Sequence, residues 1–107
     1  MITVYGSPLC KDCLAMKIIF EQLNVDYQYV NITGKSLDLC AFLQMREENP
    51  AFTVYKKNGG IGIPFFVKDG KETFDINEAL SWEGIAPVAE DEINRIKEEI
   101  RKVVGKE

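Results

Sequence analysis

Two β-prone segments lie on either side of an amphipathic helix in the first third of the 107-residue chain. Residues 2–5 and 27–32 are rich in β-branched and aromatic side chains, which favour strands. Between them, apolar residues recur with helical spacing at Met16, Ile19, Phe20 and Leu23. A strand, a helix and a second strand within so short a stretch predict two parallel strands joined by a right-handed crossover.

A second helix is expected over residues 36–49, with Ser36 as its cap and Pro50 at its end. The apolar positions of this helix are Leu37, Leu39, Cys40, Phe42 and Leu43. We therefore expect Cys40 to be a buried, inert thiol. Residues 51–57 are expected to form one or two further helical turns or a structured loop.

The second half of the chain predicts a hairpin and two more helices. A strand over residues 61–67 turns at Asp69-Gly70 and returns antiparallel over residues 72–75. A brief helix capped by Asn77 follows. The last helix carries its apolar residues at Ile93, Ile96, Ile100 and Val103. This order predicts a single α/β domain over residues 1–107, with a mixed central sheet and flanking helices in three layers.

Composition excludes several classes of function. Seventeen acidic and 13 basic residues give a net charge of −4, which offers no basic surface for nucleic acid. No apolar run reaches the ~18 residues of a membrane helix, and the N-terminus has a strand pattern rather than that of a signal peptide, so a cytoplasmic protein is expected. The chain has no histidine, which excludes Ser-His and Cys-His catalysis and His-ligated zinc.

The chemistry is expected at Cys10-Lys11-Asp12-Cys13, between the first strand and the first helix. Unpaired backbone N–H groups at a helix start favour a Cys10 thiolate; Lys11 adds to this effect and Asp12 opposes it. We expect the pKa of Cys10 to lie about one unit below its usual value near 8.5. Cys13 lies one turn further, within reach of a disulfide. In thiol–disulfide exchange, the Cys10 thiolate would attack a target disulfide and Cys13 would resolve the mixed disulfide.

Two segments about fifty residues apart resemble the glutaredoxin-related branch of the thioredoxin-like superfamily. They are Tyr5-Gly6-Ser7-Pro8-Leu9-Cys10-Lys11-Asp12-Cys13 and Gly62-Ile63-Pro64-Phe65-Phe66-Val67. The resemblance covers most of the chain and implies a thioredoxin fold, with Cys10 as nucleophile and Cys13 as resolving thiol. It also implies a cis peptide bond before Pro64, which would place the backbone of Ile63 where it can pair with a thiol peptide. The implied substrates are protein disulfides or glutathione mixed disulfides.

Several positions depart from the pattern of glutathione-using members of that family. Lys11 and Asp12 stand where Pro and an aromatic residue are usual, and Ser7 stands where a basic residue is usual. Lys11, Arg46 and Lys56 are the candidate ligands for the glycyl carboxylate of glutathione. We expect no bound cofactor, with glutathione as reductant or co-substrate, protein disulfides as partners, and a monomer.

Three other functions stay open. Two chains could each contribute Cys10 and Cys13 to a zinc ion or an iron–sulfur cluster, as a binding module without reductase activity. The arsenate-reductase-like branch shares the motif, but an oxyanion substrate would require arginines around Cys10, and none precedes Arg46. A thioredoxin-like domain can also serve only as an interaction scaffold.

Overall fold

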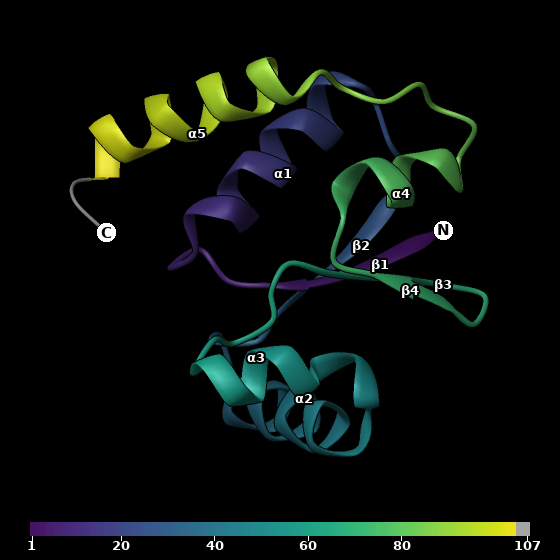
Figure 1. The fold of residues 1–107 in the computed structure, drawn as a ribbon, viewed down its shortest axis with the longest axis vertical. Helices are drawn as coiled ribbons and strands as arrows, with labels where there is room; N and C mark the ends of the chain where they lie inside the picture. The colour runs from purple at the N-terminus through teal and green to yellow at the C-terminus, as the bar shows by residue number, and fades with distance from the viewer. Residues whose placement is uncertain (105–107) are drawn as a thin grey trace.

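A four-stranded mixed sheet with helices on both faces forms the centre of the computed structural model, which describes residues 1–104. The strands are β1 (Ile2–Gly6), β2 (Tyr27–Asn31), β3 (Phe65–Lys68) and β4 (Lys71–Thr73), in the spatial order β2-β1-β3-β4. β1 runs parallel to β2 and antiparallel to β3, and β3 runs antiparallel to β4. The predicted α/β class with a mixed sheet is confirmed. Figure 1 shows helices α1, α4 and α5 on one face of the sheet and α2 and α3 on the other.

The first helix, α1 (Lys11–Gln22), makes the predicted crossover between β1 and β2. Three of its predicted apolar positions, Met16, Ile19 and Phe20, are buried against the sheet and α5. The fourth, Leu23, follows the last helical turn and is partly exposed. The helix begins directly after Cys10, so both cysteines of the motif lie in or next to its first turn.

The second helix, α2 (Ser36–Glu48), differs from its prediction in its cap and in its buried side. Lys35 occupies the N-cap position, so the prediction of Ser36 as the cap was wrong. Cys40 is exposed, so the prediction of a buried thiol was also wrong. The helix has two apolar rows. The row that contains Phe42 is covered, because Phe42 packs against Tyr5 of β1 and edge-on against the ring of Phe52. The other row faces solvent; Leu37 at its start is 81% exposed.

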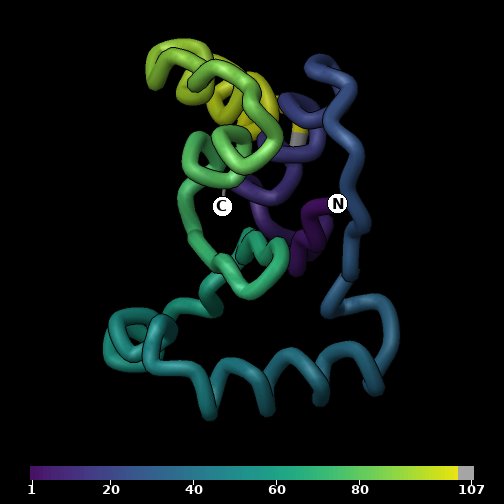
Figure 2. The backbone as a smooth tube through the Cα atoms, turned by 90° about the vertical axis from the view of Figure 1, so that its right-hand side faces the viewer, coloured from purple at the N-terminus to yellow at the C-terminus, as the bar shows by residue number. Residues whose placement is uncertain are grey.

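Two short helices, η1 (Pro50–Phe52) and α3 (Thr53–Asn58), follow α2 and confirm the expected helical turns. They bring Phe52 into the centre of an aromatic core below the sheet. The Phe52 ring centroid lies 4.7 Å from that of Phe65 and 5.0 Å from that of Phe74. Figure 2 shows α2 crossing the end of the molecule opposite α5, so this core lies between α2, α3 and the sheet.

The loop before β3 is longer than predicted, because the strand begins at Phe65 rather than at residue 61. Gly62 has a φ of +93°, which breaks the extended conformation. A Cβ at this glycine would lie 2.7 Å from the Phe52 ring, so the aromatic core requires glycine here. The expected cis peptide bond between Ile63 and Pro64 is present.

The β3–β4 hairpin has the predicted tight turn, since Asp69 and Gly70 both have positive φ. The next helix, α4 (Ile76–Ser81), is capped by Asp75, whose side chain accepts a hydrogen bond from the backbone N–H of Asn77. The prediction of Asn77 as the cap was wrong. The Asn77 side chain instead bonds the backbone N–H and carbonyl of Val88 at 2.8 and 3.0 Å, which fixes the segment before α5.

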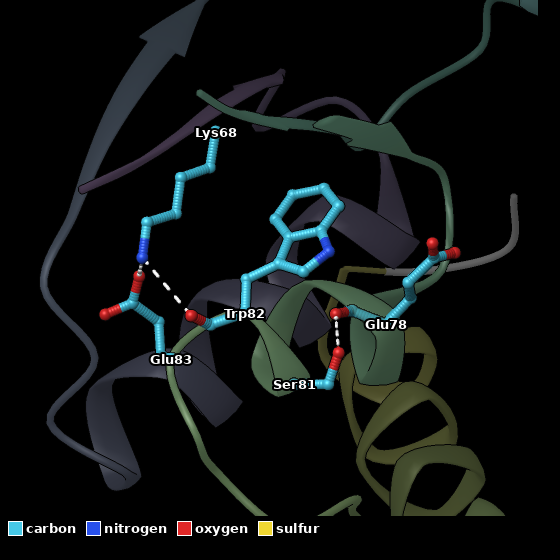
Figure 3. A network of polar contacts seen from close by, with 5 residues as sticks. All are labelled: Lys68, Glu78, Ser81, Trp82 and Glu83. Atoms are coloured by element: carbon cyan, nitrogen blue, oxygen red, sulfur yellow. Dashed lines mark hydrogen bonds and ion pairs between the residues drawn. The ribbon is translucent and has the colours of Figure 1, made fainter. Parts of the chain in front are cut away.

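A polar network joins the end of β3 to the end of α4 (Figure 3). Lys68 Nζ lies 2.5 Å from a carboxylate oxygen of Glu83 and 3.2 Å from the carbonyl oxygen of Trp82. A cation near the last carbonyls of a helix suits its dipole. The network therefore ties α4 to the sheet.

The last helix, α5 (Glu90–Val104), packs along α1. Ile96 and Ile100 are buried against Ala15 and Ile19, as their spacing predicted. Val103 is 83% exposed, so its predicted place on the buried side was wrong. It lines an open hollow together with Leu14 and Ile18 of α1. Within residues 1–104, no helix has both the length and the apolar character needed to cross a membrane.

Candidate active site

Cys10 and Cys13 lie together at the start of α1, with their thiols unbonded. Cys10 is the N-cap residue, and its Sγ accepts a hydrogen bond from the backbone N–H of Cys13 at 3.3 Å. Cys10 is half-buried, whereas Cys13 is 0% exposed. A reagent in solution can therefore contact the sulfur of Cys10 directly, whereas the buried sulfur of Cys13 is shielded from it.

The environment of the two thiols separates their pKa values. Hydrogen bonding from the Cys13 side chain is the largest influence on Cys10, and with the backbone N–H groups of Asp12 and Cys13 it lowers the pKa of Cys10 to about 7. Burial and the negative charge of Asp12 oppose this shift, the latter as expected. The same hydrogen bond and burial raise the pKa of Cys13 well above its usual value. At neutral pH the site thus holds one partly ionised thiol, Cys10, and one protonated thiol, Cys13.

The loop that carries Cys10 is fastened to the end of β2 by Ser7. The Ser7 hydroxyl lies 2.7 Å from the hydroxyl of Thr33 and accepts a hydrogen bond from the backbone N–H of Leu9 at 3.1 Å. Ser7 is 1% exposed, so its role is to hold this loop. Sequence reasoning missed this role, although a serine directly before Pro8 is a signal for such a local hydrogen bond.

Ile63 lies beside the dithiol, as expected: its carbonyl oxygen is 3.8 Å from Cys10 Sγ. Arg46 supports the loop that leads to it. The guanidinium of Arg46 donates to the carbonyl oxygens of Ile61 and Gly60, at 2.9 and 2.5 Å. The residue singled out as a carboxylate ligand therefore shapes the loop before Pro64.

The other two candidate cations lie away from Cys10. Lys11 lines a shallow hollow on the side of α1 that faces α5, together with Lys97 and Arg101. Lys56 contacts Glu47, through the backbone carbonyl at 3.2 Å. Within the described chain, the structure does not gather the predicted cations around Cys10.

An apolar groove of about 340 Å³ opens beside Cys10. Its walls are the side chains of Leu9, Tyr55, Ile61 and Ile63, from the loops before α1 and β3 and from α3. A second hollow, of about 290 Å³, lies on the side of Pro64 that faces α4 and α5, and it includes Asp12, Asp75 and Lys97. Cys10 thus borders a surface suited to apolar side chains.

Residues 1–104 contain no cluster of three or more His, Cys, Asp or Glu side chains placed to hold a metal ion. One chain therefore supplies the two thiols of Cys10 and Cys13 as its soft ligands at this site, and further ligands for zinc or an iron–sulfur cluster would have to come from elsewhere.

Comparisons with known proteins bear on the same part of the chain. A family model described as Glutaredoxin matches residues 2–70, which include both cysteines of the motif and Pro64. No curated protein matches the sequence. Among solved structures, the chain is similar to glutathione transferase E6 from Drosophila melanogaster, with 21% sequence identity and a TM-score of 0.49. That alignment covers 89% of this chain, which spans 41% of the length of the transferase.

Proposed function

Because the chain belongs to the glutaredoxin family, we propose that it reduces disulfides with Cys10 as the nucleophile and Cys13 as the resolving thiol. The family consists of thiol oxidoreductases with the thioredoxin fold. One observation carries the proposal: the half-buried Cys10 sulfur begins a helix and accepts a hydrogen bond from the Cys13 backbone N–H at 3.3 Å.

In the first step, the Cys10 thiolate attacks one sulfur of a target disulfide. A pKa of about 7 leaves roughly half of the Cys10 thiols ionised at neutral pH, while the sulfur stays a competent nucleophile. The target disulfide breaks, its second sulfur leaves as a thiolate with the electron pair and takes up a proton, and a mixed disulfide forms on Cys10.

In the second step, Cys13 resolves the mixed disulfide. Its burial and raised pKa keep it protonated until the mixed disulfide has formed, which prevents Cys13 from competing for the target. Cys13 then loses its proton and bonds to Cys10 Sγ, and the reduced target leaves. An external thiol returns two electrons to the Cys10–Cys13 disulfide.

We propose protein disulfides and glutathione mixed disulfides as substrates, with glutathione as reductant or co-substrate and no bound cofactor. The backbone of Ile63, beside Cys10, can pair with an extended thiol peptide by strand addition. The apolar groove supports clients that carry an apolar side chain next to the reactive cysteine. The cytoplasm, where thiols are kept reduced, is the proposed location, and a monomer is the proposed state.

A trapping experiment tests this function. Because Cys40 is exposed, it is first replaced by serine so that it forms no adduct of its own. In that background, a Cys13→Ser variant is incubated with oxidised glutathione or with a disulfide-bonded protein such as insulin, and the product is analysed by mass spectrometry. An adduct on Cys10 with either reagent is expected. The matched Cys10→Ser variant, which keeps only the buried Cys13, should form none.

The absence of any Cys10 adduct would overturn the reductase proposal. Metal analysis and visible absorbance of freshly purified protein with Cys10 and Cys13 intact would then identify a zinc or iron–sulfur module. A glutathione adduct without a protein adduct would restrict the substrate to glutathione mixed disulfides, and the reverse result would restrict it to proteins.

A further inference from the structure

Tyr29 lies in the middle of β2 with a buried hydroxyl that has no hydrogen-bond partner among the described residues. Its ring is partly buried against the core formed with Met16, Phe20 and Phe66. Buried side-chain hydroxyls nearly always find a partner, so an unpartnered one requires a reason. The redox mechanism described above does not use this group.

Tyr29 Oη and Cys13 Sγ both border the same small space beside Gly6. Gly6, the last residue of β1, keeps that space open: a Cβ at Gly6 would lie 2.7 Å from Tyr29 Oη and 3.0 Å from Cys13 Sγ. Any other residue at position 6 would therefore place a methyl or larger group against both the hydroxyl and the sulfur. Without a side chain at this position, the hydroxyl and the thiol adjoin the same open space.

Lys17 of α1 packs over the ring of Tyr29 and helps to hold it in place. It lies one helical turn after Cys13 on α1, and its Nζ is 4.8 Å from the centroid of the Tyr29 ring, within the range of a cation–π contact. Burial and the nearby thiols raise the pKa of Tyr29, so its hydroxyl keeps a proton to donate.

We propose that Tyr29 is a positioning residue for the resolving step, and that its hydroxyl donates a hydrogen bond to Cys13 Sγ as this sulfur ionises. The inference rests on the proposed function. In the step, the Cys10–client S–S bond breaks and the Cys10–Cys13 bond forms. The client sulfur leaves with the electron pair and takes up the proton that Cys13 released, while Tyr29 keeps its own. In the reduced protein Cys13 carries its proton, which accounts for a hydroxyl that has no partner until the reaction begins.

The two steps can be separated with an aromatic disulfide whose thiolate is coloured, 5,5′-dithiobis(2-nitrobenzoate). One equivalent reacts with the reduced full-length Cys40→Ser protein in a stopped-flow spectrometer. The first release of coloured thiolate reports the attack by Cys10, and the second reports resolution by Cys13. Tyr29→Phe keeps the ring and its contact with Lys17 but removes the hydroxyl.

We expect Tyr29→Phe to leave the first release unchanged and to slow the second about tenfold, the size of one hydrogen bond to a charged group. The pH midpoint of the second release should rise by about one unit, because the Cys13 thiolate loses a donor. Tyr27→Phe is the matched control: Tyr27 lies two residues away on the same strand, and its hydroxyl contacts Glu21 at 3.4 Å. It should change neither release.

Resolution by Tyr29→Phe at the wild-type rate and with the wild-type pH profile would overturn the inference. So would equal slowing in Tyr27→Phe, or slowing of both releases in Tyr29→Phe, since either result assigns the tyrosine a structural role. If the protein with both thiols intact gives no first release, the proposed reductase function fails instead.

Discussion

The backbone N–H of Cys13 donates a hydrogen bond to Cys10 Sγ across 3.3 Å, between two residues three positions apart at the start of α1. The contact places Cys13 next to Cys10 before any disulfide forms. It also stabilises the ionised form of Cys10, so a single turn of helix would serve both steps of the proposed reaction.

This contact predicts that Cys10 ionises near neutral pH. In a Cys40→Ser background, the rate of alkylation of Cys10 by iodoacetamide should rise with a midpoint near pH 7. In urea, where the helix is absent, the midpoint should return to about 8.5. Equal midpoints in the folded and unfolded protein would contradict the assignment of Cys10 as the activated nucleophile.

The same shift predicts how stability changes with pH. The pKa of Cys10 is lower in the folded protein, at about 7, than its usual value near 8.5, so its contribution to stability is fully present above about pH 9 and is lost as the pH falls through 7. The unfolding free energy of the reduced protein, measured relative to Cys10→Ser in urea, should therefore increase from pH 7 to pH 9. A flat difference over this range would contradict the lowered pKa. The raised pKa of Cys13 acts in the opposite direction above pH 9, so the comparison ends there.

Gly62→Ala should destabilise the protein far more than Gly70→Ala. Both glycines have positive φ, at +93° and +82°, so alanine is strained at either position by about 1–2 kcal/mol. Only at Gly62 would the new methyl meet the Phe52 ring, at 2.7 Å, whereas nothing lies within 4 Å at Gly70. Overpacking should add about 1–3 kcal/mol at Gly62, measurable by urea unfolding. An equal decrease in unfolding free energy for the two variants would show that the Phe52 ring moves aside at little cost.

Arg46→Ala should lower the unfolding free energy by about 1–3 kcal/mol, because the carbonyl oxygens of Gly60 and Ile61 lose a donor that reaches both. Arg46→Lys should restore little, since one ammonium lacks the planar fork of the guanidinium. Arg95→Ala, which removes an exposed partner of Glu92, is the control and should change stability by no more than about 0.5 kcal/mol. If Arg46→Ala instead left stability unchanged and raised the KM for glutathione, the role as carboxylate ligand would be supported.

Much of the sheet and of the redox motif could be predicted from the sequence, because their signals are local. The β-prone residues of β1, the tight turn at Asp69-Gly70 and the spacing of Cys10 and Cys13 act through neighbouring residues. These features do not depend on what packs against them. Prediction from a single sequence therefore performs well for them.

Features that depend on distant partners were missed. The apolar rows of α2 are similar in sequence, and contacts with distant residues such as Tyr5 and Phe52 decide that Phe42 is buried and Cys40 is not. The space shared by Gly6, Cys13 and Tyr29 joins two strands and a helix, and no local pattern indicates that these residues meet. The N-cap of α4 was missed for the same reason. Asp75 and Asn77 are both good capping residues, and the hydrogen bonds between Asn77 and the distant Val88 leave Asp75 as the cap.

The ion pair between Lys97 and Asp12, with their charged atoms 3.4 Å apart, gives the C-terminal helix a part in the chemistry of the N-terminal motif. A truncated fragment ending at residue 70 would keep both cysteines but would expose the face of α1 that α5 covers. It would also leave the carboxylate between the cysteines without its nearest cation, which works against ionisation of Cys10. The four-residue motif therefore does not carry its reactivity by itself. A second protein that receives this motif would also need a helix that covers α1 and supplies a cation beside Asp12.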